Sequence, residues 1–143
     1  EIFGFNNRMT EIHAAIGRVQ LSKLAGWTRK RQANAAYLNE HISGVITPPT
    51  APEAVHVFHQ YTIRIVGHDR DRFAEELASR GVGSGVYYPT PIHRLPSFGL
   101  ELDLPTTELV ASQVLSLPIY PSLTDDDLHT IATAVNEVAK AGS

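Results

Sequence analysis

Cysteine is absent from this chain of 143 residues, and so are long apolar runs and any excess of basic residues. Without cysteine the chain has no disulfide framework, no thiol nucleophile and no thiolate metal site. No apolar run approaches the length of a membrane span, and the first residues lack the basic start and apolar block of a secretory signal. A formal net charge of -3 argues against nucleic acid or an anionic membrane as the main partner. We therefore predict a soluble, cytoplasmic protein.

The hydrophobic content is sufficient for one compact domain. Hydrophobic residues make up 43% of the chain, and a chain of this length forms one core more readily than two. There is no low-complexity segment and no internal repeat. Because the first residue is Glu1 and not methionine, we expect the sequence to be a piece of a longer protein.

The first periodic segment predicts a long helix over residues 9–42. Thr10 is a suitable N-cap, and the pattern stops at Ser43 and Gly44. Two apolar rows run along the segment, Ile12-Ile16-Val19 and Leu21-Leu24-Trp27. Together they are wider than the stripe that a surface helix needs to cover its own sheet. We expect one row to lie uncovered, so that the isolated chain associates with itself; the alternative is that this row packs under the proline-rich residues 48–52.

The rest of the chain alternates between strand and helix patterns. Residues 57–66 alternate as in a strand, and the side chains expected on its buried face are Val57, His59, Tyr61, Ile63 and Ile65. Next come a helix capped by Asp69, a glycine-rich turn with a short strand, a short helix, a strand at 114–117 and a last helix capped by Thr124. The predicted fold class is α/β, with a long N-terminal helix and further helices packed on a small, mostly antiparallel sheet.

The histidines and the acidic cluster do not predict a metal site. His56 and His59 are three residues apart on a predicted strand, so their side chains leave opposite faces and cannot chelate one ion. His59 lies on the expected apolar face, where we interpret it as a hydrogen-bonded core histidine. The carboxylates at 125–127 are explained by capping and by the helix dipole, and not by paired-carboxylate catalysis.

Two loops remain as candidate binding segments. The glycines of "RGVGSGV" follow a helix and enter a strand, the reverse of the order that phosphate binding at a helix N-terminus requires. The next segment, "VYYPTPIH", places Tyr87, Tyr88 and His93 on a loop stiffened by Pro89 and Pro91. Such a loop is suited to binding a sugar or another ring, but ordinary surface loops have the same composition.

The opening segment, "FGFNNRM", has the composition of an anion-binding loop. Gly4 frees the backbone, Asn6 and Asn7 tolerate turn conformations, and Arg8 supplies a forked cationic donor for phosphate or carboxylate. A segment that merely precedes a helix can have the same composition, so the residues alone leave both interpretations open.

Four blocks in this order and at these intervals resemble one family. They are "GFNNRMTEIHAAIGRVQLSKL", "HQYTIRI", "RGVGSGVYYPTPIH" and "LSLPIYPSLTDDDLHTIATAV". Together they are similar to the C-terminal part of the DegT/DnrJ/EryC1/StrS aminotransferases, which have the aspartate-aminotransferase fold. The resemblance spans essentially the whole chain. It implies that residues 1–143 form the small C-terminal domain, and that a large cofactor-binding domain precedes them in a longer protein.

The resemblance also implies an activity and a set of site residues. Members use pyridoxal 5'-phosphate to move an amino group, commonly from glutamate, onto a nucleotide-linked keto-sugar in cell-wall or antibiotic sugar biosynthesis. The family lead-in is G-x-N-x-R-M, so Asn6 and Arg8 are expected to bind the cofactor phosphate of the neighbouring subunit in a homodimer. Tyr87, Tyr88 and His93 are expected to bind the sugar nucleotide. Tyr87 stands where many relatives have histidine, so the sugar pocket is expected to differ in detail.

The resemblance implies that the catalytic lysine lies outside this chain. In the family the Schiff-base lysine precedes the G-x-N-x-R-M segment, and the lysines here are Lys23, Lys30 and Lys140, all on predicted helix faces. We therefore expect no catalytic residue in this chain and no turnover by it alone. Two alternatives stay open: a dehydratase of the same family, in which histidine replaces the lysine, and a free-standing α/β oligomerisation module.

Overall fold

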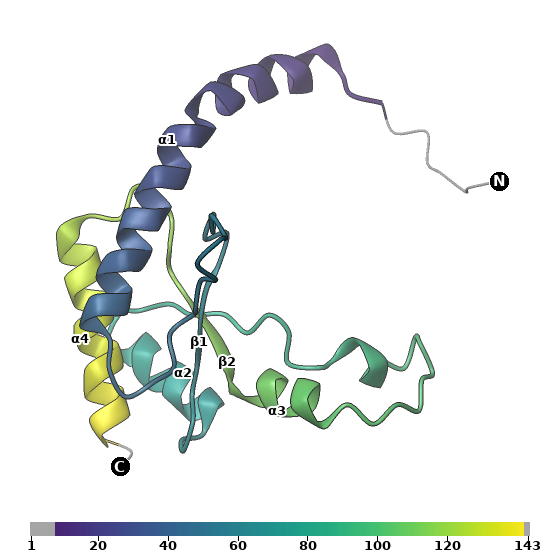
Figure 1. The fold of residues 1–143 in the computed structure, drawn as a ribbon, viewed down its shortest axis with the longest axis vertical. Coiled ribbons are helices and arrows are strands. Elements are labelled where there is room, and N and C mark those ends of the chain that lie inside the picture. The colour runs from purple at the N-terminus through teal and green to yellow at the C-terminus, as the bar shows by residue number, and fades with distance from the viewer. Residues whose placement is uncertain (1–7, 142–143) are drawn as a thin grey trace.

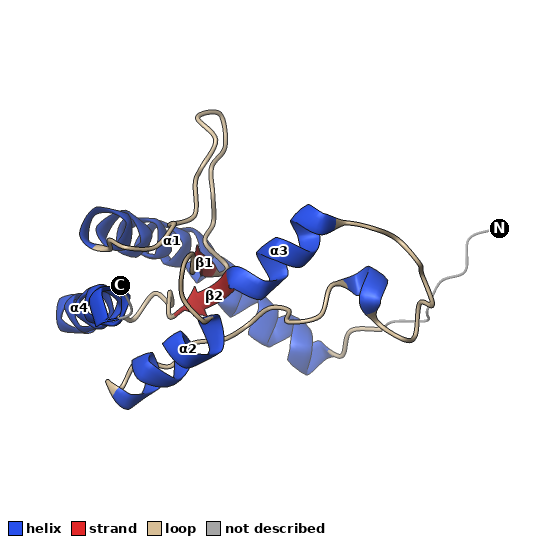
Figure 2. Ribbon diagram, turned by 90° about the horizontal axis from the view of Figure 1, so that it is seen from below, coloured by secondary structure: helices blue, strands red, loops and turns tan. Residues whose placement is uncertain are grey.

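The computed structural model describes residues 8–141. Its elements are, in chain order, α1 (Glu11–His41), β1 (Tyr61–Arg64), α2 (Arg70–Ser79), the 3-10 helix η1 (Ile92–Arg94), α3 (Pro105–Gln113), β2 (Val114–Leu117) and α4 (Asp125–Ala141). The two strands lie at the centre. On one side of them are α2, α4 and the C-terminal half of α1, and on the other side is α3 (Figures 1 and 2). The predicted α/β fold class, with helices packed on a small antiparallel sheet, is confirmed.

The sheet consists of two antiparallel strands, extended at each edge by a single bridge. Tyr61 pairs with Leu117 at one end of the ladder, and Arg64 pairs with Val114 at the other. Ile46 bridges to Arg64, and Gly85 bridges to Ser116. The short strand predicted within the glycine-rich segment is therefore wrong: glycine has little strand propensity, and only the Gly85 bridge forms.

The core lies between the strands and the three helices on that side. Its largest fully buried side chains come from both strands and from α1, α2 and α4: Tyr61, Leu38, Ile63, Ile65, Leu77, Leu115 and Val135. Along α4 the predicted apolar stripe is confirmed, with buried residues at helical spacing: Leu128, Ile131, Val135 and Val138. Burial raises the pKa of the Tyr61 hydroxyl, which donates to Asn39 Oδ1 at 2.7 Å.

The three predicted N-caps are confirmed. Thr10 Oγ1 accepts from the His13 backbone N–H at 3.3 Å, and Asp69 Oδ1 accepts from the Arg72 backbone N–H at 2.8 Å. Thr124 Oγ1 accepts from the Asp127 backbone N–H at 3.1 Å. Each side chain satisfies a backbone donor that has no partner within the first turn of its helix.

The strand predicted over residues 57–66 is shorter than expected, and His59 is not a core residue. Tyr61, Ile63 and Ile65 are buried as predicted, but Val57 and His59 are exposed. The cause is Phe58, whose φ of 45° lies in the left-handed region. This turn breaks the alternation of side chains, so that Phe58 takes the buried place instead of its neighbours.

Local contacts hold Phe58 in this conformation. Its backbone N–H donates to His56 Nδ1 at 2.9 Å, and the two rings lie 4.2 Å apart. On the other side, the Phe58 ring is 6.3 Å from that of Tyr61. Burial of one aromatic ring thus compensates for an unfavourable backbone angle.

The N-terminal half of α1 extends beyond the core. The helix is continuous and curved, and its first turns project away from the strands (Figure 1). Both predicted apolar rows are exposed up to Leu24, and the exposed fraction reaches 73% at Ile12 and 69% at Leu21. They are therefore not covered by residues 48–52, and the helix meets the core only from about Asn34 onward.

Residues 87–104, which we call the arm, form the second projection. The arm leaves the Gly85 bridge, carries η1 and leads into α3, on the side of the strands away from α4 (Figure 1). Large apolar side chains are exposed along it: Tyr88, Ile92, Phe98, Leu100, Leu102 and Leu104. Within residues 8–141, no helix is long and apolar enough to span a bilayer.

Candidate functional site

A cavity opens where the start of β1, the end of β2 and the glycine-rich segment meet α1. Its volume is about 490 Å³, and we call it the central cavity. Its lining residues are Arg31, His59, Gln60, Gly83, Ser84, Gly85, Tyr87, Ser116, Leu117, Pro118, Ile119 and Tyr120. The lining combines one cation, several neutral hydrogen-bonding groups and two tyrosines, a composition typical of a site for a polar ring-containing ligand.

Tyr87 belongs both to the central cavity and to a second hollow. The second hollow, the α3 groove, has a volume of about 450 Å³ and lies between the arm and α3. Tyr88, Thr90, Ile92 and Val110 are among its lining residues. The rings of Tyr87 and Tyr88 lie 5.9 Å apart and nearly perpendicular. The tyrosine pair therefore forms the wall between the two hollows.

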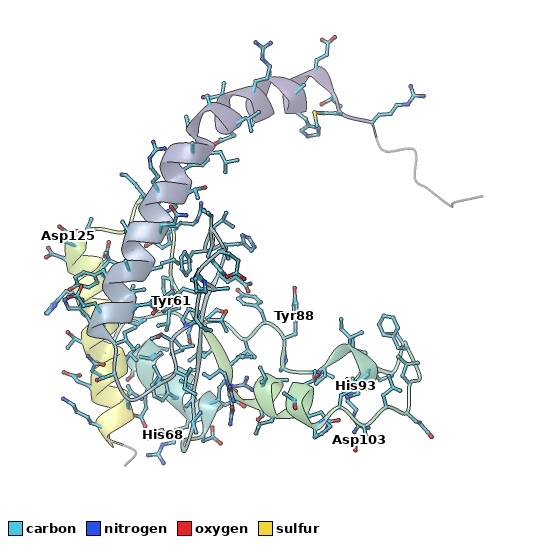
Figure 3. The ribbon with its side chains drawn as sticks, in the orientation of Figure 1. Tyr61, His68, Tyr88, His93, Asp103 and Asp125 are labelled. Atoms are coloured by element: carbon cyan, nitrogen blue, oxygen red, sulfur yellow. The ribbon has the colours of Figure 1, made fainter. Side chains whose placement is uncertain are left out.

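Tyr88 is the more exposed member of the pair. Its side chain points into the open space between the arm and the projecting half of α1 (Figure 3), and 74% of it is exposed. Tyr87 is 52% exposed. Two exposed rings on a loop that contains Pro89 and Pro91 present a stiff aromatic surface, which can position a ligand ring at little entropic cost.

His93 lies in a different environment from the tyrosines. It is buried, with 6% of its surface exposed, and its Nε2 is 3.1 Å from Glu108 Oε1. His93 belongs to η1 in the arm, and this contact with Glu108 joins η1 to α3 (Figure 3). The structure therefore brings Tyr87 and Tyr88 together at the hollows and places His93 behind them.

Glu108 joins α3 to the arm through three donors. Besides His93, the Arg94 guanidinium donates to the same Oε1 from Nε at 3.0 Å and from a terminal nitrogen at 2.6 Å. The hydrogen bonds from His93 and Arg94 hold the pKa of the Glu108 carboxyl below its usual range. This cluster ties the segment after Tyr88 to the first turns of α3, and so limits the movement of the tyrosine loop.

The structure describes only one of the two residues expected at the cofactor phosphate. Asn6 lies outside the described residues, and Arg8 is exposed just before α1. Their role stays a prediction, as does the sugar-nucleotide role of Tyr87, Tyr88 and His93.

The described residues do not by themselves fit a pyridoxal phosphate site. Such a site needs a lysine that faces the cofactor carbonyl, and no lysine lines the central cavity or the α3 groove. Lys23 Nζ lies 5.9 Å from the centre of the Trp27 ring, and Lys140 is exposed on α4. Lys30 lines only a smaller hollow, with Trp27, Arg31, Pro121 and Ser122.

Sequence reasoning missed several residues at the site. Arg31 was hidden within the periodic pattern of α1, and Ser84 and Tyr120 lie within two of the blocks that carry the family resemblance but were given no role there. Glu108 could have been noticed as a carboxylate in the first turn of a predicted helix, but its two partners lie 14 and 15 residues away in the sequence. Among residues 8–141 no group of three metal-ligating side chains comes together.

A model of the DegT/DnrJ/EryC1/StrS aminotransferase family matches residues 1–136. The chain is 34% identical to UDP-N-acetyl-3-dehydro-alpha-D-glucosamine 3-aminotransferase from Acidithiobacillus ferrooxidans, over 94% of this chain and 37% of that protein. It is 37% identical to dTDP-3-amino-3,4,6-trideoxy-alpha-D-glucose transaminase from Streptomyces venezuelae, over 98% of this chain and 38% of that protein. The chain thus spans less than two fifths of the length of these relatives.

Solved structures show the same fold. DesV from S. venezuelae, solved in complex with a ketimine intermediate, superposes with a TM-score of 0.88 at 35% identity, over 98% of this chain and 39% of that one. The aminotransferase TlmJ from Streptoalloteichus hindustanus also gives a TM-score of 0.88, at 30% identity and with the same coverage of both chains.

Proposed function

Because the chain belongs to the DegT/DnrJ/EryC1/StrS aminotransferase family, we propose that it is the C-terminal small domain of a pyridoxal-phosphate-dependent sugar aminotransferase. The full-length protein would transfer an amino group from an amino acid such as glutamate to a nucleotide-linked keto-sugar. The observation that carries this proposal is the similarity, over nearly the whole chain, to two enzymes that are named for amino transfer on nucleotide-linked sugars.

In this proposal, the described residues supply only part of the active site of the full-length protein. Because they do not complete a cofactor site, the lysine and most cofactor contacts would come from the part of the protein that precedes them. The cofactor, when bound, supplies the electron sink for amino transfer. This chain would contribute the aromatic wall of Tyr87 and Tyr88 to the sugar-nucleotide side, with His93 and Glu108 bracing it.

The opening segment would serve a neighbouring subunit. In this proposal the protein is a homodimer, and Asn6 and Arg8 bind the cofactor phosphate of the partner subunit. The projecting half of α1 supports this, because its exposed apolar rows need a partner surface that the described residues do not supply.

The first experiment measures the activity of the longer protein. We expect it to transfer the amino group of glutamate to a nucleotide-linked keto-sugar and to show the absorbance of bound pyridoxal phosphate. Absence of amino transfer with a panel of such sugars, despite bound cofactor, would contradict the proposal. Release of water from the sugar without amino transfer would instead identify the dehydratase, as would a histidine at the lysine position.

The second experiment separates the cofactor residues from the substrate residues. Asn6→Ala should weaken cofactor retention, because loss of one charge-assisted contact costs about 1.5 to 3 kcal/mol. Tyr88→Ala should raise the substrate KM and leave the cofactor absorbance intact. Phe98→Ala is a matched control, since Phe98 is an exposed aromatic residue farther along the same arm. Loss of cofactor in Tyr88→Ala with unchanged substrate KM would reverse these roles.

A further inference from the structure

We propose that Arg31 makes the central cavity a binding site for an oxyanion, a phosphate or carboxylate group carried by the substrate. This inference deepens the proposed function and rests on it for the identity of the ligand.

Arg31 differs in position from the other arginines of α1. Arg18 and Arg29 are exposed, whereas Arg31 is half-buried, one turn before the buried residues Asn34 and Ala35. That turn packs on the core, so the backbone that carries the guanidinium is fixed. Arg31 lies between two hollows, because it lines both the central cavity and the smaller hollow beside Lys30.

The charge of Arg31 is not neutralised within the described residues. It makes no hydrogen bond or ion pair with any residue from 8 to 141, and no aspartate or glutamate lines either hollow. A half-buried guanidinium without a carboxylate favours an anion more strongly than a solvated one does, because water screens it less.

The hollows near α2 provide the contrast. There the cations are already paired: Arg70 with Asp71, Arg72 with Glu76, and Arg94 with Glu108. Aspartate or glutamate also lines both of those hollows. Although the chain carries a net charge of -3, the central cavity is therefore locally positive, and an anion there meets no repelling carboxylate.

Neutral groups around Arg31 complete the environment of an oxyanion. His59, Gln60, Ser84 and Tyr120 line the same cavity, and their side chains are of types that can donate hydrogen bonds. A Cβ at Gly83 would meet no atom within 4 Å, so a ligand can approach the backbone there. The planar guanidinium matches the two oxygens of a phosphate or carboxylate, and the other groups can hold the remaining oxygens.

Tyr87 relates this site to the substrate. It lines the cavity together with Arg31 and belongs to the aromatic wall proposed for the sugar nucleotide. The oxyanion would therefore be attached near a ring that contacts Tyr87. Both substrates of the proposed reaction carry such a group. The nucleotide-linked sugar carries a diphosphate, and the amino-acid donor carries carboxylates.

Titration of the 143-residue chain, followed by amide NMR signals, tests the proposal directly. The probes are inorganic pyrophosphate and, separately, L-glutamate. We expect one of them to shift the signals of Ser84, Gly85 and Tyr120 saturably, and the probe that does so identifies the source of the oxyanion. Arg31→Gln should weaken that binding by about 10- to 100-fold, as expected for loss of a charge-assisted contact.

Two further variants keep the test decisive. Arg29→Gln removes the same charge from the exposed face of the same helix, and it should leave binding unchanged. Arg31→Lys keeps the charge but loses the planar fork, and it should weaken binding less than Arg31→Gln does. Unchanged signals from Tyr61 and Leu115 would show that the core of each variant is intact.

Two results would overturn the proposal: no saturable shift with either probe up to about 10 mM, or an equal loss of binding in Arg29→Gln. These results are distinguishable from failure of the proposed function. If the longer protein transfers amino groups and the cavity binds neither probe, only the oxyanion site is refuted. If pyrophosphate binds through Arg31 and the longer protein transfers no amino group to any nucleotide-linked sugar, only the proposed reaction is refuted.

Discussion

Gly85 lies so close to Tyr87 that a Cβ at position 85 would be 2.8 Å from both Cε2 and the hydroxyl oxygen of the Tyr87 ring. The backbone of Gly85 cannot withdraw, because it exchanges two hydrogen bonds with Ser116, at 3.0 and 2.7 Å. The absence of a side chain at residue 85 therefore allows the Tyr87 ring to occupy its place between the central cavity and the α3 groove.

Gly85→Ala should displace the Tyr87 ring and leave the fold nearly intact. The clashing atoms belong to the far end of a half-exposed side chain, so the ring can rotate at a cost below the roughly 1 to 3 kcal/mol of an overpacked core. We expect a several-fold increase in substrate KM of the longer protein and a small change in the free energy of unfolding. Enzyme kinetics and denaturant unfolding measure the two effects.

Gly26→Ala is the control, since a Cβ there meets no atom within 4 Å and Gly26 lines neither the central cavity nor the α3 groove. It should leave KM unchanged and, because Gly26 lies within α1, the variant should be as stable as wild type or slightly more stable. If both alanine variants raise KM equally, the role assigned to the Gly85–Tyr87 contact is wrong.

Glu108→Gln should weaken the attachment of the arm to α3, and do so in a pH-dependent way. Because the folded-state pKa of Glu108 is lowered by His93 and then by Arg94, its carboxylate stabilises the fold above the unfolded pKa of about 4.3. That contribution is lost as the pH falls through the lower folded pKa. We therefore expect wild type to be more stable than the variant at neutral pH, and the difference to shrink under acid.

Denaturant unfolding of both proteins between neutral and acidic pH measures this difference. Glu101→Gln is a suitable control, because Glu101 is an exposed carboxylate of the arm. A stability difference between wild type and Glu108→Gln that stays constant down to the lowest pH would show that the charge of Glu108 does not anchor the arm.

Thr124→Ala should destabilise the chain by about 0.5 to 2 kcal/mol, the usual cost of removing an N-cap. Thr124 and Asp127 bond reciprocally: Asp127 Oδ2 accepts from the Thr124 backbone N–H and from its hydroxyl, each at 2.8 Å. The backbone hydrogen bond from Thr124 and then the hydroxyl bond lower the pKa of Asp127. Thermal unfolding of the variant, followed by circular dichroism, measures the loss.

Thr133→Ala provides the comparison, because Thr133 is exposed in the interior of α4 and alanine has the higher helix propensity. That variant should be as stable as wild type or slightly more stable. Equal destabilisation by both changes would mean that the loss at position 124 is unrelated to capping.

The 143-residue chain should associate with itself through the projecting half of α1. The apolar rows at Ile16, Leu21 and Leu24 are at least half exposed, and exposed apolar patches above a few hundred Å² tend to be interaction sites. We expect sedimentation velocity to show a mass that rises with concentration, and the double change Leu21→Lys with Leu24→Lys to shift the chain toward monomer. Leu109→Lys, on exposed α3, is the control and should leave association unchanged. A monomer at every concentration would refute this prediction and leave the family assignment untouched.

Features set by neighbouring residues could be predicted from the sequence. The caps at Thr10, Asp69 and Thr124, the strand at 114–117 and the stripe along α4 depend on side chains within about a turn of one another, or on a simple period. The same holds for the family resemblance, because its motifs are contiguous. The α/β class follows from these local patterns, since an apolar helix stripe and an apolar strand face must cover each other.

Other features depend on contacts between residues that are distant in the chain, and only the tertiary structure could decide them. The exposure of His59 results from the burial of the Phe58 ring in the core, which both strands and distant helices form, and this burial overrides the alternation of the strand. The place of His93 results from Glu108, 15 residues away, and a short motif cannot show which distant carboxylate will meet it. In the sequence, Arg31 is one of several basic residues on a long predicted helix. It becomes a candidate anion ligand because the glycine-rich segment and the end of β2, more than fifty residues later, form a cavity beside it that contains no carboxylate.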